Sequence, residues 1–176
     1  MLQILNKNLK MGCIRMKRKK VWILSGVPGS GKTTWARKQI QNYGGVHCSR
    51  DEVRFSLLKD NEDYFAHEDE VWDLWIKSII DAINNPEITD IYVDATHLNE
   101  KSREKVLKLL PIDKEKEVVT VIFNISLNKC LENNEKRKNE GRAYVPRETI
   151  RKMYASFNPI TFLSPFMTIN EEDVLK

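Results

Sequence analysis

The sequence predicts an α/β fold in which a parallel sheet of about five strands is covered by helices on both faces. Three observations predict it. Short β-type runs alternate with longer helical segments along the chain. The first of these runs is apolar throughout, as in a strand buried on both faces. A glycine-rich stretch then joins that run to the first helix. With 176 residues, the chain has about the length of a single domain.

The first half of the chain predicts two strands and two helices. Residues 21–25 (VWILS) form a continuous apolar run of strand length, and a helix should follow over 32–41. Residues 46–49 predict a second, short strand. The segment 69–84 predicts a helix because its apolar residues recur at three- and four-residue spacings, and an Asn-Asn-Pro sequence ends it.

The second half continues the alternation. Apolar and β-branched runs predict strands at 88–95, 117–125 and, from a weaker pattern, 166–169. Helical patterns bounded by proline or glycine predict helices at 99–110, 127–139 and 147–157. Ligands of such sheets bind beyond the carboxyl ends of the strands. The stretches that follow the first three strands are therefore the candidate site.

Composition excludes several classes of protein. No apolar run approaches the roughly 18 residues of a membrane span, so no membrane association is expected. The net charge of +4 is mild and permits a polyanionic partner. Three scattered cysteines match no metal or disulfide pattern and predict a cytoplasmic, reducing environment. The basic residues 1–19 predict a flexible tail, or alternatively a patch that attracts nucleic acid, before a single domain over 20–176.

The glycine-rich stretch GVPGSGKT fits the pattern G-x-x-x-x-G-K-[ST] without a mismatch. Its glycines let backbone N–H groups surround a phosphate at a helix N-terminus. Lys32 is expected to reach the β- and γ-phosphates of ATP, and Thr33 to ligate Mg²⁺. The residues predicted to bind the nucleotide are Gly26, Pro28, Gly29, Ser30, Gly31, Lys32, Thr33 and Thr34.

An acid and an arginine follow the second strand. Asp51 precedes Arg54 by three residues, so a helix starting near Asp51 places both side chains on one face. Asp51 could accept the proton of an attacking hydroxyl, and Arg54 could bind an acidic part of the substrate. The alternative, equally compatible with the spacing, is that Asp51 caps the helix and Arg54 is a surface residue.

Asp94 ends the third apolar strand, as an acid that holds a Mg²⁺ shell does in nucleotide-binding folds. Its alternative role is that of a helix cap or turn residue. Asp94 is also expected to touch the substrate, together with Thr96 and His97, which follow it. His97 has no ligand partner at a metal-binding spacing, so substrate contact is favoured over metal binding.

Residues 136–146 form a basic, glycine-containing segment between two predicted helices, which suits a helical lid that closes over phosphates. Arg137 or Arg142 could stabilise charge on the transferred phosphoryl group. The alternative is a solvated helix end, where cations are favoured in any case.

The motifs GVPGSGKTTWA, SRDEVR, VDATHLN and RAYVPRETIRKMYASF resemble the phage-type polynucleotide 5′-hydroxyl kinase family over about residues 20–157. The resemblance implies a P-loop NTPase/kinase fold with Asp51 as general base on the 5′-hydroxyl. It also implies that Arg54 contacts a substrate phosphate and that an arginine before the Val-Pro pair, Arg142 or Arg137, is catalytic. No phosphatase domain and no 3′-end processing are expected.

We therefore expect an ATP- and Mg²⁺-dependent kinase that phosphorylates 5′-hydroxyl ends of DNA or RNA in end repair. One alternative is a small-molecule kinase that acts on a nucleoside, a sugar or a nucleotide sugar, as zeta-toxin-like proteins do. A further alternative, from a different class, is a nucleotide-binding switch without an acceptor. Affinity for oligonucleotides that falls steeply with salt would distinguish the first hypothesis.

Overall fold

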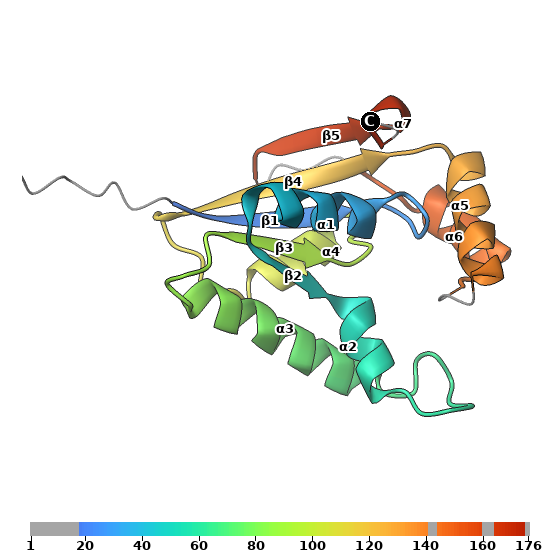
Figure 1. The fold of residues 1–176 in the computed structure, drawn as a ribbon, viewed down its shortest axis with the longest axis horizontal. Coiled ribbons are helices and arrows are strands. Elements are labelled where there is room, and N and C mark those ends of the chain that lie inside the picture. Colours follow the sequence, from blue (N-terminus) through green and yellow to red (C-terminus); the bar gives the residue numbers. More distant parts are fainter. Residues whose placement is uncertain (1–17, 141–143, 160–163, 175–176) are drawn as a thin grey trace, which may run out of the picture.

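The computed structural model describes residues 18–140, 144–159 and 164–174. Its five strands form one sheet in the order β2-β3-β1-β4-β5, and every neighbouring pair is parallel (Figure 1). The strands are β1 (Lys19–Ser25), β2 (Val46–Ser49), β3 (Asp90–Asp94), β4 (Lys116–Asn124) and β5 (Phe166–Asn170). The predicted parallel sheet of about five strands is confirmed.

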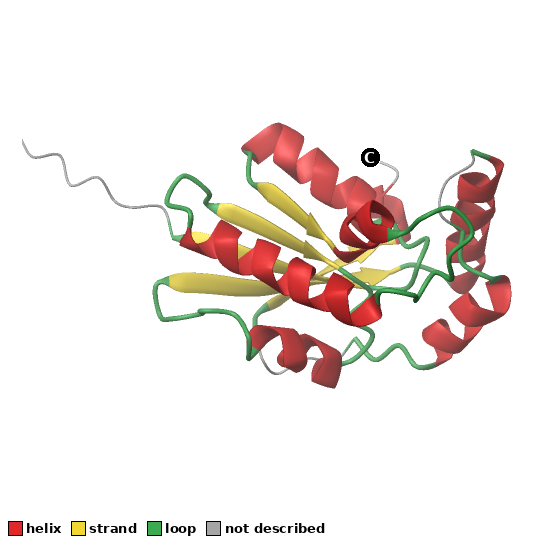
Figure 2. Ribbon diagram, turned by 90° about the horizontal axis from the view of Figure 1, so that it is seen from below, coloured by secondary structure: helices red, strands yellow, loops and turns green. Residues whose placement is uncertain are grey.

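Helices lie on both sides of this sheet (Figure 2). They are α1 (Lys32–Tyr43), α2 (Arg50–Leu57), α3 (Glu68–Asn84), α4 (Glu100–Leu107), α5 (Leu127–Asn139), α6 (Arg147–Ala155) and α7 (Glu171–Val174). The sequence-based bounds agree to within three residues; α2 was considered only as a helix starting near Asp51, and the short α7 was not predicted. Among the described residues, no helix is both long and apolar enough to cross a membrane.

The continuous apolar run of β1 divides between two core clusters because successive side chains of a strand point to opposite faces. Val21 and Ile23 pack with residues of α3 and α4 on one face, including Trp75. Leu24 packs on the other face with residues of α1 and α5, including Ala36. This two-sided burial explains why the strand has no alternation of apolar and polar residues.

Strand β1 begins inside the segment that the sequence assigned to a basic tail. Lys19 is its first residue, and the Lys19 ammonium group donates hydrogen bonds to the backbone carbonyls of Asn85 and Ile88. The tail boundary at residue 19 was therefore wrong by one residue, because a lysine satisfies carbonyls at the end of α3. The rest of the predicted tail, 1–17, lies outside the described residues.

All five strands end at the same edge of the sheet because they are parallel. Beyond that edge lie the loop after β1, the start of α2, the loop after β3, and helices α5 and α6 (Figure 1). The three candidate stretches are thus next to one another, as the sequence predicted from the direction of the strands.

Candidate active site

The loop between β1 and α1 depends on glycine at two positions. Gly29 and Gly31 have φ angles of 84° and 93°, which residues with a side chain rarely adopt. A Cβ atom at Gly29 would lie 2.2 Å from the carbonyl oxygen of Cys130 in α5. The Asn133 side chain, also in α5, donates a hydrogen bond of 2.9 Å to the Gly29 carbonyl. The loop is therefore packed directly against α5.

Lys32 is buried at the start of α1, where its ammonium group binds the loop itself. It donates hydrogen bonds of 2.7 and 2.9 Å to the carbonyls of Gly26 and Val27, and it lies 3.4 Å from the Ser30 hydroxyl. Burial lowers the pKa of Lys32, while the charge of Asp94 opposes this shift. A positive charge is thus held at the centre of the predicted phosphate cradle.

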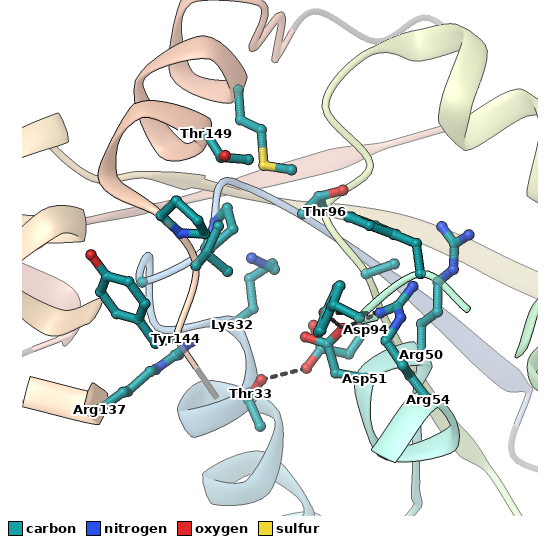
Figure 3. A pocket seen from close by; sticks show the side chains of 18 of the residues that line it. Lys32, Thr33, Arg50, Asp51, Arg54, Asp94, Thr96, Arg137, Tyr144 and Thr149 are labelled. Atoms are coloured by element: carbon teal, nitrogen blue, oxygen red, sulfur yellow. Dashed lines mark hydrogen bonds and ion pairs between the residues drawn. The ribbon is translucent and has the colours of Figure 1, made fainter. Parts of the chain in front are cut away.

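Thr33 and Asp94 are in direct contact. The Thr33 hydroxyl donates a hydrogen bond of 2.7 Å to Oδ2 of Asp94 (Figure 3). His47 Nε2 lies 2.9 Å from the same oxygen. Burial alone would raise the pKa of Asp94, but the hydrogen bond with His47, the charge of Lys32 and the Thr33 bond hold it below its ordinary value. Asp94 is therefore an ionised, buried carboxylate beside a threonine hydroxyl.

Asp51 lies in the first turn of α2, but it is not the helix cap. Ser49 has that role, since its hydroxyl accepts a hydrogen bond from the Glu52 N–H. Asp51 Oδ1 instead accepts hydrogen bonds of 2.7 Å from Arg54 and 2.8 Å from the Tyr64 hydroxyl. Its Oδ2 has no hydrogen bond within the described part of the chain. One oxygen is fixed, and the other is available to a substrate.

Arg54 is only 5% exposed, which excludes the surface role that the spacing alone permitted. Its second terminal nitrogen donates a hydrogen bond of 2.7 Å to Glu68 in α3. The other carboxylate oxygen of Glu68 accepts a hydrogen bond from Arg50. Glu68 therefore holds both arginines of the predicted acceptor motif, a role that the sequence analysis missed.

Tyr64 belongs to the loop between α2 and α3, which the sequence analysis left without a role. The Arg54 guanidinium carbon lies 4.4 Å from the centre of its ring, and Arg54 also donates to its hydroxyl at 3.0 Å. Burial, and then the charge of Asp51, raise the pKa of Tyr64 to about 12. The phenol therefore remains protonated and can donate to Asp51 at any physiological pH.

One cavity of about 440 Å³ brings these groups together (Figure 3). The volume is within the range of small-molecule sites, roughly 300–1,000 Å³. Its walls include Pro28, Gly29, Lys32, Thr33, Asp51, Arg54, Asp94 and Thr96, all of which the sequence predicted. Gly26 donates its backbone N–H to the Thr96 carbonyl at 2.9 Å, which joins the first loop to the loop after β3. Thr34, the last predicted nucleotide-binding residue, is exposed in α1 and is not among the residues of this wall.

The opposite wall of the cavity comes from the segment predicted as a lid. Arg137 lines it from α5, and Tyr144, Val145 and Pro146 line it from the chain before α6. Residues 136–139 are helical rather than part of a loop. The buried Asn134 side chain binds both backbone groups of Val145, at 2.8 and 3.1 Å. Arg142, the other predicted catalytic arginine, lies outside the described residues.

His97 occupies a different position from the one expected. It is buried, and its Nδ1 lies 2.8 Å from the Leu24 carbonyl, which can only accept a hydrogen bond. Its Nε2 is buried without a hydrogen-bond partner in the described structure, and burial lowers the pKa of the ring to about 4. His97 is not among the residues that line the 440 Å³ cavity, but it lines a second, smaller cavity beside it, so the expected substrate contact stays a prediction.

The remaining titratable groups give no indication of a metal cluster. Within the described ranges, no group of three or more His, Cys, Asp or Glu side chains could hold a metal ion. Cys48 and Cys130 are buried free thiols, and burial raises the pKa of each to about 11. Neither is therefore a ready nucleophile.

A family model described as an AAA domain, AAA_33, matches residues 21–160. The chain belongs to this AAA domain family. The matched region begins in β1 and ends after α6, so it contains every candidate site residue placed above. The AAA domain has the fold of the P-loop kinases. The match does not confirm the phage-type kinase family that the motifs resemble.

Solved structures of kinases share the fold of this AAA domain. A structure of the Pnkp1/Rnl/Hen1 RNA repair complex matches with a TM-score of 0.67 and 23% identity, over 79% of this chain and 44% of that chain. A fungal RNA kinase matches with a TM-score of 0.60 and 12% identity, over 86% and 38%. A gluconokinase from Sinorhizobium meliloti 1021 matches with a TM-score of 0.56 and 16% identity, over 89% and 84%. The AAA domain thus spans less than half of the RNA repair and RNA kinase chains.

Proposed function

We propose that this AAA domain transfers the γ-phosphoryl group of ATP to the 5′-hydroxyl end of a polynucleotide. One observation carries the proposal. The Asp51 carboxylate lines the same cavity as Lys32 and Thr33, and its orientation is fixed through one oxygen only. A general base needs this arrangement, because its second oxygen must remain able to accept the hydroxyl proton.

Each of these residues has a separate role in the transfer reaction. The acceptor oxygen forms the new bond to the γ-phosphorus, its proton passes to Asp51 Oδ2, and ADP leaves with the electrons of the broken P–O bond. Lys32 stabilises the charge of the β- and γ-phosphates, and Arg137 faces the cavity from α5. Positioning and electrostatics account for most of the acceleration in such transfers.

The contact between Thr33 and Asp94 fits a site for Mg²⁺. A hydroxyl and a carboxylate are oxygen ligands that Mg²⁺ prefers, and the second is ionised. Thr33 would bind the ion directly, and Asp94 would hold its shell. When bound, Mg²⁺ neutralises charge on the β- and γ-phosphate oxygens. His47 keeps Asp94 oriented toward Thr33 through its own contact at 2.9 Å.

A phosphate-bearing acceptor is supported by Arg54 and by the structural matches. Arg54 is buried beside the proposed base and lines the cavity. A planar guanidinium in that position suits a phosphodiester next to the reacting hydroxyl. The structures that match include an RNA repair complex and a fungal RNA kinase.

Transfer of label from γ-labelled ATP tests the proposal. A 5′-hydroxyl oligonucleotide should accept label, whereas the same oligonucleotide with a 5′-phosphate should not. Asp51→Asn should retain ATP binding and reduce turnover by about a hundredfold or more, the usual contribution of a general base. Asp73→Asn makes the same chemical change at an exposed position of α3 that does not line the cavity, and as the matched control it should retain activity. Full turnover by Asp51→Asn would exclude the assigned base.

A small-molecule kinase is the second candidate. The gluconokinase match extends over 84% of that chain, unlike the matches to the RNA enzymes. The cavity wall opposite the lid also combines Asp63 with Tyr64 and Phe65, and carboxylates beside aromatic rings suit a sugar. Label transfer to gluconate or a nucleoside that is insensitive to salt would favour this candidate over the polynucleotide. ATP binding without transfer to any acceptor would instead indicate a nucleotide-dependent switch.

A further inference from the structure

A second cavity, of about 230 Å³, lies next to the first on the acceptor side. The two cavities share three lining residues, Arg50, Ala95 and Thr96. From this shared wall, the second cavity extends between α3, which contributes Trp72, and α4, which contributes Lys105. The two cavities are therefore adjacent at these three residues.

The second cavity is positively charged. The Lys105 ammonium group lies 4.2 Å from the centre of the Trp72 ring, and the Arg50 guanidinium lies 5.2 Å from the same centre. None of the described residues that line the cavity is acidic. Glu68, which binds Arg50, lines the first cavity and not the second. The Trp72 ring attracts both cations, and of the two it is Arg50 that is also paired with a carboxylate, that of Glu68.

Arg50 is paired with Glu68 through one terminal nitrogen, and two further observations concern the donors that remain on the two cations. Nε of Arg50 is buried and has no hydrogen-bond partner in the described structure. Lys105 is exposed, and it is not part of any ion pair among the described residues. Buried polar groups without partners are uncommon in proteins and are often satisfied by a ligand or water. The nearby Lys108, by contrast, already pairs with Glu104 at 2.7 Å.

We propose that this cavity binds a second backbone phosphate of the acceptor, the one after the phosphate held by Arg54. Arg50 and Lys105 supply the positive charge, and Trp72 keeps both cations in place. The inference rests on the proposed function and makes it more specific, since it assigns the preferred acceptor as a chain with at least two phosphates. A nucleoside or a simple sugar has no group for this site.

Acceptors of different length test this inference on the full chain. The first acceptor is a 5′-hydroxyl nucleoside 3′-phosphate, with one phosphate, and the second is a 5′-hydroxyl dinucleotide 3′-phosphate, with two. Wild-type protein should have a lower KM for the dinucleotide. Lys105→Gln should raise that KM roughly fivefold, the effect of one exposed charge contact. It should leave the KM for the mononucleotide and for ATP unchanged.

Lys108→Gln, on the same helix and with the same change in charge, is the matched control and should behave as wild type. For a longer oligonucleotide, Lys105→Gln should also reduce the slope of log affinity against log salt by about one unit relative to this control. Equal KM values for the two acceptors, or equal effects of the two substitutions, would refute the second site and leave the proposed function intact. Absence of label transfer to every oligonucleotide would refute both.

Discussion

Glu68→Gln is the substitution that most directly tests how the acceptor side is held together. In the structure, Glu68 accepts one hydrogen bond from Arg54 at 2.7 Å and another from Arg50. The substitution keeps the shape of the side chain but removes its charge. One of the two arginines would then face an amide NH₂ group, which cannot accept a hydrogen bond.

The expected size of the effect follows from burial. The Arg54 side chain is 6% exposed and the Glu68 side chain 34%, so this pair is only partly screened by solvent. A hydrogen bond to a charged group contributes roughly 1.5–3 kcal/mol, and a neutral one about 1 kcal/mol. After discounting for the exposure of Glu68, the free energy of unfolding should fall by about 2 kcal/mol.

Catalysis should respond in a specific way. If the displaced Arg54 stabilises the transition state less by the same 2 kcal/mol or so, kcat/KM for a 5′-hydroxyl oligonucleotide should fall by about 30-fold. The KM for ATP should stay unchanged, because Glu68 does not touch the glycine-rich loop. Steady-state label transfer measures the first effect, and urea denaturation measures the loss of stability.

A double-mutant cycle separates a positioning role from a merely structural one. If Glu68 acts through Arg54, then Glu68→Gln should have little further effect on kcat/KM in an Arg54→Gln background. Glu70→Gln is the control, since the Glu70 side chain is 60% exposed in the same helix turn. Additive losses in the double mutant would contradict the reasoning.

Two further substitutions test the parts that support the site. His97→Asn should reduce the acid sensitivity of folding, because unfolded histidine gains a proton near pH 6.5 and buried His97 only near pH 4. The free energy of unfolding therefore falls as the pH falls through that window. Urea denaturation should show that, between pH 7 and 5, wild type loses about 2 kcal/mol more of this free energy than the variant. The same pH dependence in both proteins would contradict this. Asn134→Ala removes both bonds to Val145 and should cost about 2 kcal/mol of unfolding free energy, with a raised KM for ATP.

The nucleotide side of the site was largely predictable because its residues are close in sequence. Lys32 and Thr33 belong to one continuous motif, and a motif at a strand–helix junction determines its own local geometry. Asp94 was also predictable, since the end of a buried strand is a defined position at the sheet edge. The contact between Thr33 and Asp94 then follows from the parallel strand order.

The acceptor side was only partly predictable because its contacts connect distant segments. The spacing of Asp51 and Arg54 predicted a shared helix face, but it could not distinguish a buried arginine from an exposed one. That distinction depends on Glu68 and Tyr64, which lie 14 and 10 residues beyond Arg54. No spacing rule relates a helix to a following loop of irregular structure, so neither residue carried a signal in the sequence.

His97 shows a different limit of inference from sequence. A polar residue after a strand in an α/β fold is usually close to the ligand, and this led to the expectation of substrate contact. In the structure the ring is buried beside Trp75, with ring centres 5.8 Å apart, the residue has a positive φ of 42°, and it does not line the 440 Å³ cavity. The strand direction locates the loop, but the backbone conformation within it decides which side chains face the cavity.

These two halves of the site have different physical requirements, and this explains why proteins with different acceptors share the fold. Every triphosphate needs the same backbone cradle, lysine and hydroxyl, so the nucleotide side has little freedom to vary. The acceptor side consists of side chains from α2, α3, α4 and the loop that carries Tyr64, and its walls can change without altering the sheet. The acceptor must therefore be inferred from these walls. In this AAA domain they provide a buried arginine next to the proposed base and a cationic cavity beyond it, and that combination favours an acceptor with consecutive phosphates over a neutral sugar.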